Sequence, residues 1–278
     1  MDLWLLRIAI IVYLIATASQ LAFLVTLKAE VRKFASWVTW GAFALHTVLL
    51  LTRLFAGGYA PMATLHEAYS FFGWCTLGLY LVLLLRYSIP SLGAFATPLA
   101  LILLLGAAVT PSDIIELPPA LQSGWLPIHV GLLFIGNAAF GIAAVSGIMY
   151  LIQERQLKKK KLGMLFHRLP NIEVLDEIGY RCLTIGFPFL TLGIITGAAW
   201  AQEAWGTYWS WDPKETWSLI TWFIYAALLH GRMTVGWRGR KAALWAIGGF
   251  ACVLFTFLGV NYVLPLILPN VQSLHIYG

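Results

Sequence analysis

Eight long apolar runs constrain this chain more than any other feature of its sequence. Each is close to the length, about 20 residues, that a helix needs to cross the hydrocarbon core of a bilayer. Only 11% of the 278 residues are charged, whereas a soluble domain is about 25% charged. The surface must therefore face lipid, which excludes a soluble enzyme, a nucleic-acid-binding protein and a disordered chain. We predict an all-α polytopic membrane protein with about eight transmembrane helices, at Trp4–Leu27, Phe34–Leu54, Tyr69–Leu85, Leu92–Val109, Trp125–Leu151, Cys182–Ala201, Thr216–Met233 and Ala243–Val263.

The distribution of basic residues predicts the orientation. If both termini lie outside, the outer side keeps only Arg7, Arg53 and Lys214 among the 18 Lys and Arg residues, and the other 15 lie in inner loops, as the positive-inside rule requires. The first apolar run is too long for a signal peptide and precedes no small-residue cleavage site, so we expect it to be retained. We expect one integral membrane domain over residues 1–278, with the basic run Lys158–Lys161 touching anionic lipid on the inner side.

The three cysteines argue against redox chemistry in this chain. Cys75, Cys182 and Cys252 each lie inside an apolar run, and no CxxC motif occurs. The chain therefore has no sequence signature of a thiol–disulfide exchanger or of covalent haem attachment. We expect the cysteines to be small buried hydrophobic residues.

The predicted outer segment 200–222, called here the tryptophan loop, has an unusual density of aromatic residues. Six tryptophans and Tyr208 occupy 23 residues, whereas an interfacial aromatic belt needs only one or two aromatics per helix end. We expect a flat, rigid apolar surface suited to a large planar ligand, with Gly206 allowing close backbone approach. The aromatic members proposed to bind this ligand are Trp205, Tyr208, Trp209, Trp211 and Trp217.

The same loop carries a helix-start signal. Asp212 followed by Pro213 predicts an N-cap and a first helical residue, with Glu215 in the first turn. Capping is the expected role of Asp212 and Glu215, although Asp212 also lies where a ligand of the loop would bind. No side chain of the chain is an obvious catalytic acid or base.

Two histidines are expected on the same outer side as the tryptophan loop. His129 lies one turn into the fifth predicted helix, and His275 lies in the C-terminal tail. Neutral imidazole is the standard axial ligand of haem iron. Two histidines from opposite faces would complete a six-coordinate iron, so haem is the planar ligand that this pattern favours.

These residues carry a family resemblance. The segment Trp205-Gly-Thr-Tyr-Trp-Ser-Trp-Asp-Pro-Lys-Glu-Thr-Trp217 resembles the tryptophan-rich WWD signature of haem-handling proteins in cytochrome c maturation, in the CcsA/ResC form of the system II pathway. Leu121-Gln-Ser-Gly-Trp-Leu-Pro-Ile-His129, Gly259-Val-Asn261 and Leu274-His275 are similar to flanking segments of that family. The resemblance extends from Leu45-His46-Thr47 to the C-terminus.

The resemblance implies an eight-helix protein of the bacterial cytoplasmic or thylakoid membrane. It implies that the chain, with a CcsB/ResB-type partner, brings haem b across the membrane and presents it for thioether attachment to CxxCH of apocytochrome c. The chain would then be the haem-binding subunit of a holocytochrome c synthase. By match, His129 and His275 ligate the iron over the tryptophan loop, and His230 ligates haem within the membrane, with its second axial ligand attributed to the partner.

The remaining polar candidates have open roles. His230 lies 13 residues beyond Trp217, about 20 Å along a helix, and intramembrane ionisable residues are functional candidates by default. His46 is either an in-chain second ligand or, as we prefer, a core histidine. Arg53 and Lys214 are outer bases that suit haem propionates. His66 stands where the family usually has another residue, and its role is open.

Two other functions compete with this hypothesis. A haem exporter or chaperone without ligation activity needs the same residues. A cytochrome b-type electron-transfer subunit would place paired histidines inside the helix bundle, and it leaves the tryptophan loop unexplained.

Overall fold

The computed structural model describes residues 2–160, 163–267 and 273. Their regular structure is entirely helical, which confirms the predicted fold class. The chain forms two compact units, one of residues 1–115 and 151–175 and the other of residues 116–150 and 176–278. The expectation of a single domain stays a prediction.

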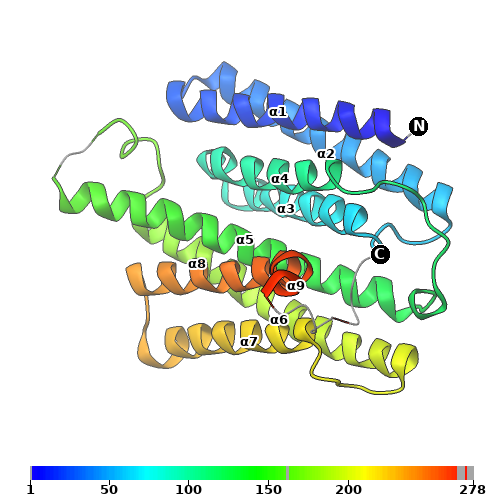
Figure 1. Cartoon of the computed structure of the whole chain (residues 1–278). Coiled ribbons are helices and arrows are strands. Elements are labelled where there is room, and N and C mark those ends of the chain that lie inside the picture. The colour runs from blue at the N-terminus through cyan, green and yellow to red at the C-terminus, as the bar shows by residue number, and fades with distance from the viewer. Residues whose placement is uncertain (1, 161–162, 268–272, 274–278) are drawn as a thin grey trace. The chain divides into compact units, whose positions relative to one another are not determined.

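All eight predicted runs are helices (Figure 1). Among the described residues, seven helices are long and apolar enough to cross a membrane. The exception is α7, whose 18 residues include the charged first turn with Lys214 and Glu215. The bounds are α1 Asp2–Thr26, α2 Ala29–Gly57, α3 Leu65–Tyr87, α4 Gly93–Ala108, α5 Trp125–Lys158, α6 Ile172–Trp205, α7 Pro213–His230, α8 Arg240–Leu254 and α9 Leu264–Ile267, with π-helical turns at Gly231–Val235 and Phe255–Val263.

The first unit is built on α1 to α4. In this unit α1 packs against α2 and α4, and α3 packs against α4 (Figure 1). A small residue permits the closest of these approaches: a Cβ on Gly73 would lie 3.1 Å from the carbonyl oxygen of Ala100. Small residues let helices approach closely in membranes, where lipid tails remove the usual hydrophobic drive for association.

The second unit places α5 against α6 and α8 in the same way. A Cβ on Gly136 would lie 3.1 Å from the Gly186 carbonyl oxygen, and a Cβ on Gly147 would lie 3.0 Å from that of Ala243. The helices α7 and α8 lie side by side (Figure 1). This packing fixes the end of α6 and the start of α7, where the candidate site lies.

The cysteines lie in helical interiors, as expected. Cys75 and Cys182 are buried, Cys252 is half-buried, and all three are free thiols.

Candidate functional site

The segment 200–222, called the tryptophan loop above, consists of the end of α6, a connection at residues 206–212 and the first part of α7. The helix α6 ends at Trp205, and Gly206 follows with φ 77°, a left-handed conformation that glycine adopts without steric cost. Trp211 also has a positive φ, 59°, and its side chain is 70% exposed. This backbone conformation is unfavourable for a bulky residue and is typically held by its surroundings at binding sites.

The predicted helix start at Asp212 is confirmed. The Asp212 side chain accepts a hydrogen bond from the Lys214 N–H at 2.8 Å, and Pro213 is the first helical residue. Glu215 completes a capping box: its Oε2 accepts from the N–H groups of Asp212 at 3.1 Å and Ser210 at 2.8 Å. Both carboxylates therefore fix the loop backbone, as expected of capping residues.

The indole rings of the loop meet edge to face, so the expected single flat surface is not formed. Trp209 and Trp211 have ring centroids 5.8 Å apart at 90°. Trp200 and Trp205 are 4.9 Å apart at 62°. The positive edge of one ring is attracted to the negative face of the next, which favours this geometry over coplanar rings. The loop consequently offers separate indole faces in different directions.

Trp217 and Tyr208 occupy different surroundings. Trp217 packs on Phe255 with ring centroids 4.3 Å apart, so it supports α7 against the segment after α8. Tyr208 is 64% exposed. Exposed Tyr208 and Trp211 are therefore the aromatic side chains of the loop most accessible to a ligand.

His129 is held in a defined orientation at the start of α5. Its Nδ1 lies 2.7 Å from the Gly193 carbonyl oxygen, and its ring stacks on Trp200 with centroids 5.9 Å apart at 26°. A carbonyl oxygen only accepts, so Nδ1 carries the proton and the lone pair of the neutral ring lies on Nε2. A metal-binding histidine almost always donates its other ring N–H in this way.

Two glycines on α6 let α5 approach closely, and one of them makes room for this histidine. A Cβ on Gly197 would lie 2.5 Å from His129 Cε1 and 2.6 Å from Nδ1, and a Cβ on Gly193 would meet Leu133. Sequence reasoning missed this pair, although the spacing Gly193-x-x-x-Gly197 is a known signal for close helix packing in membranes.

The segment before α5 is tied to the end of α6. Ser123 donates from Oγ to Glu203 at 2.9 Å, and the Trp200 indole N–H donates to the Ala120 carbonyl oxygen at 2.9 Å. These two bonds hold the approach to His129 beside the beginning of the tryptophan loop. Sequence reasoning did not anticipate them, because the partners are 80 residues apart.

A C-terminal residue reaches the tryptophan loop. Ser273 is buried, and its Oγ donates to Asp212 Oδ1 at 2.8 Å. His275, the second predicted outer ligand, lies outside the described residues. The contact between Ser273 and Asp212 was not foreseen from the sequence.

Lys214 lies partly buried in the first turn of α7. Burial lowers its pKa to about 7, because the charged form loses hydration, while the neighbouring Asp212 acts in the opposite direction. A lysine in this state gains or loses its charge near neutral pH.

His230 is the last residue of α7, at the end of the helix opposite the tryptophan loop, and its side chain is exposed. The intervening 18-residue helix spans about 27 Å. His129 and His230 therefore belong to separate sites within the second unit.

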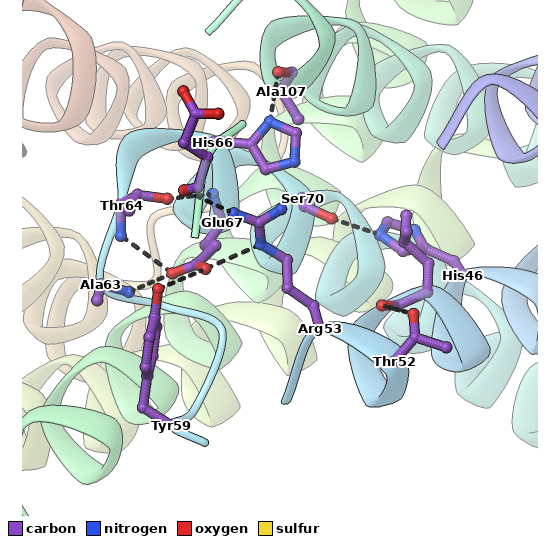
Figure 2. Close-up of polar contacts among 12 residues, drawn as sticks. His46, Thr52, Arg53, Tyr59, Ala63, Thr64, His66, Glu67, Ser70 and Ala107 are labelled. Atoms are coloured by element: carbon purple, nitrogen blue, oxygen red, sulfur yellow. Dashed lines mark hydrogen bonds and ion pairs between the residues drawn. The ribbon is translucent and has the colours of Figure 1, made fainter. Parts of the chain in front are cut away.

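Arg53 belongs to the first unit, where it forms a buried ion pair (Figure 2). Its Nε lies 2.9 Å from Glu67 Oε1, with 4% of the Arg53 side chain and none of the Glu67 side chain exposed. Oε2 of Glu67 also accepts from the N–H groups of Ala63 and Thr64, and Arg53 donates to the Asp113 carbonyl oxygen. The pair fixes the loop between α2 and α3, a role that the sequence did not predict.

His46 and His66 are both buried in this unit (Figure 2). His46 has both nitrogens engaged, with Tyr13 Oη at 2.7 Å and Ser70 Oγ at 2.9 Å. These two bonds favour the interpretation of His46 as a core histidine, which stays a prediction. Nδ1 of His66 donates to the Ala107 carbonyl oxygen at 2.8 Å, which links α3 to α4.

The fold is that of a polytopic helical membrane protein. A family model described as "Cytochrome C assembly protein" matches residues 4–268, so the chain belongs to this family. Membership of this family places the chain in cytochrome c maturation.

Within the family, the chain is of the CcsA type. It is 41% identical over 238 residues to the cytochrome c biogenesis protein CcsA of Chlamydomonas reinhardtii, covering 83% of this chain and 64% of that relative. It is 37% identical over 285 residues to CcsA of Synechococcus sp. (strain JA-3-3Ab), covering 83% of this chain and 81% of the relative.

The helical fold also recurs in a solved structure, the cytochrome c haem lyase CcmF. The two superpose with a TM-score of 0.65 at 18% sequence identity, over 93% of this chain and 46% of that one. The likeness is one of fold.

Proposed function

We propose that the chain binds haem b at the tryptophan loop, on the outer face of the membrane, and presents it for attachment to apocytochrome c. The observation that carries this proposal is the orientation of His129. Its Nδ1 donates to Gly193, its ring stacks on Trp200, and its Nε2 therefore has the lone pair that iron requires. Family membership supplies the reason why the ligand is haem.

His275 is the proposed second axial ligand. The buried bond from Ser273 to Asp212 anchors the chain at the start of α7. The bond therefore supports a role for the C-terminal segment beside the tryptophan loop. Asp212 acts in this proposal as a positioning residue, through its bonds to Lys214 and Ser273.

The exposed aromatic residues Tyr208 and Trp211 would cover the porphyrin face or edge, and Lys214 would pair with a propionate. Trp205 and Trp209 would complete the apolar surroundings. We do not assign a propionate to Arg53, because its guanidinium is already engaged with Glu67 and Asp113.

The reaction served would be the addition of two cysteine thiols of a CxxCH segment to the two vinyl groups of haem. In each addition the sulfur bonds to one vinyl carbon and the thiol hydrogen goes to the other. No external acid or base is consumed, so proximity and orientation are what the protein contributes. His129 holds the iron until the histidine of CxxCH replaces one axial ligand and the product leaves.

His230 is proposed to ligate haem within the membrane, before it reaches the tryptophan loop. Its side chain is exposed at the end of α7, where a CcsB/ResB-type partner could supply the second axial ligand of the same iron. In the first unit, the two hydrogen bonds of His46 favour a structural role. A cytochrome b-type subunit with a bis-histidine pair of His46 and His230 is therefore not supported.

The proposal is tested by cytochrome c maturation in cells that carry the chain and its partner. We expect His129→Ala to abolish covalent haem attachment, and added imidazole to restore part of it by filling the empty axial position. A normal cytochrome c yield from the double variant His129→Ala, His275→Ala would refute the proposal. A variant that fails to attach haem but still accumulates haem at the membrane would favour the exporter function.

A further inference from the structure

A second polar region lies in the second unit, at the end of α7 opposite the tryptophan loop. There the segment Gly236-Trp-Arg-Gly-Arg-Lys241, called here the basic loop, connects α7 and its π-helical extension to α8. Its three cationic side chains, Arg238, Arg240 and Lys241, are exposed. Positive charge at a helix connection commonly serves only to orient the protein in the membrane. That role needs no defined loop structure, whereas this loop is held by specific side-chain and backbone contacts.

One carboxylate fastens the loop to the two helices beside it. Asp176 on α6 accepts from Arg232 Nη1 at 3.0 Å and Nη2 at 2.8 Å, and it also accepts from the Gly239 N–H at 2.8 Å. The Arg232 guanidinium also lies over the Tyr180 ring, 4.6 Å from its centroid. The Arg232 side chain is only 6% exposed. Asp176 is thus already paired with Arg232 and with the backbone of the loop.

The backbone of the loop is equally constrained. Gly239 has φ 63°, and a Cβ at this position would lie 2.6 Å from Tyr150 Oη. The Trp237 N–H donates to the Gly231 carbonyl oxygen at 2.9 Å, and the Trp237 ring fills the space that a Cβ on Gly231 would need. The loop therefore folds back on the residue that directly follows His230.

An indole, an imidazole and several cations consequently meet at one end of α7. Lys241 Nζ lies 3.5 Å from the centroid of the Trp237 ring, and Trp237 packs on Trp245 with centroids 5.4 Å apart. His230, one residue before Gly231, is exposed at the same end. Arg guanidinium groups bind carboxylates in a bidentate geometry that fixes orientation as well as charge.

We propose that the basic loop binds the carboxylates of a haem whose iron is held at His230. This inference rests on the proposed function and deepens it. Haem combines an iron atom, a planar apolar ring and two propionate carboxylates, and the end of α7 supplies a chemical partner for each of the three. The propionates then anchor the haem at the inner end of α7, and their release allows it to leave for the tryptophan loop.

The run Lys158–Lys160 provides a matched control for charge alone. These residues lie at the end of α5 in the first unit, where Lys158 pairs with Glu154 at 2.8 Å and is 61% exposed. They carry the same number of positive charges as Arg238, Arg240 and Lys241.

The experiment compares haem with haem dimethyl ester, which keeps the iron and the ring but lacks the carboxylates. The full-length chain carries His129→Ala and His275→Ala, which remove the proposed outer ligands, and is placed in phosphatidylcholine nanodiscs. Binding is measured by absorbance titration in this background, in the same chain with Arg238→Gln, Arg240→Gln and Lys241→Gln, and in the control with Lys158→Gln, Lys159→Gln and Lys160→Gln.

We expect the background chain to bind haem about tenfold more tightly than the ester, as one charge-assisted contact would give. The basic-loop variant should lose this preference, and the Lys158–Lys160 control should keep it. Equal affinity of the background chain for both compounds would overturn the inference and leave the proposed function standing. That comparison needs no loop variant and so does not depend on how the variants fold.

Two further outcomes are decisive. If the basic-loop variant keeps its preference for haem but loses retention of phosphatidylglycerol in mixed nanodiscs, the loop is a lipid site and the inference fails. If neither haem nor its ester binds the background chain, and neither binds the chain with His129 and His275 intact, the proposed function fails as well.

Discussion

Replacing Gly197 with alanine tests the orientation of the His129 ring, with little expected change in the rest of the fold. The added Cβ would lie 2.5 Å from His129 Cε1 and 2.6 Å from its Nδ1. Contacts this short require an atom to move. The obstructing atoms belong to a side chain and not to the backbone, so we expect the imidazole to rotate away while α5 and α6 keep their packing.

Two effects of Gly197→Ala on the free energy of unfolding largely cancel. Alanine is favoured over glycine in a helix by about 1 kcal/mol. Against this, the displaced ring loses its hydrogen bond to Gly193, at a net cost of about 0.5–1.5 kcal/mol. Haem binding has no such compensation, because the lone pair on Nε2 no longer points where the iron would lie. If the lost iron–imidazole contact contributes only about 1.4 kcal/mol, the affinity for haem already falls tenfold.

The assay is haem retention on purification, read from the absorbance spectrum, together with the thermal unfolding midpoint in the same detergent. Gly131→Ala is the matched control: it lies on α5, two residues from His129, and nothing stands within 4 Å of the Cβ that it would gain. We expect Gly197→Ala to lose haem by tenfold or more with an unfolding midpoint close to that of Gly131→Ala. Full haem retention in Gly197→Ala would refute the assigned orientation of His129.

Four other variants test the buried ion pair of the first unit and the polar contacts at the start of α7. Glu67→Gln leaves the buried Arg53 charge without its counterion, and we expect a loss of about 3–5 kcal/mol in stability, seen as a lower unfolding midpoint; an unchanged midpoint would contradict the buried pair. Ser273→Ala removes the bond to Asp212, so it should lower haem retention severalfold at a cost in stability of about 0.5–1.5 kcal/mol. Asp212→Ala should lower the free energy of unfolding by about 1 kcal/mol more than Ser273→Ala does, because it also removes the N-cap of α7. Lys214, whose pKa burial lowers to about 7, is charged below that pH and neutral above it. Haem affinity in the wild type should therefore fall, relative to Lys214→Arg, as the pH rises through about 7; parallel pH profiles would remove Lys214 from the site.

The fold was predictable from the sequence because lipid imposes strict rules on it. A spanning segment must be apolar and must satisfy its own backbone hydrogen bonds, so each apolar run became a helix. The start of α7 was predictable as well, since Asp212, Pro213 and Glu215 act on their nearest neighbours. The α7 helix is the weakest span by composition, because that polar start is part of it.

The tertiary contacts were not predictable, because they depend on which helix faces meet. His129 and Gly193 are 64 residues apart, and Ser273 and Asp212 are 61 apart. No local pattern records such a pairing. The density of tryptophans indicated an aromatic site but not the angles between the rings.

The central claim is that His129 supplies an iron ligand at the tryptophan loop. The most direct measurement is the low-temperature electron paramagnetic resonance spectrum of the purified ferric complex, which distinguishes paired imidazole ligation from other axial ligands. The account predicts a bis-imidazole signal in the wild type that is lost in His129→Ala and returns when imidazole is added. An identical bis-imidazole signal in His129→Ala without imidazole would contradict it.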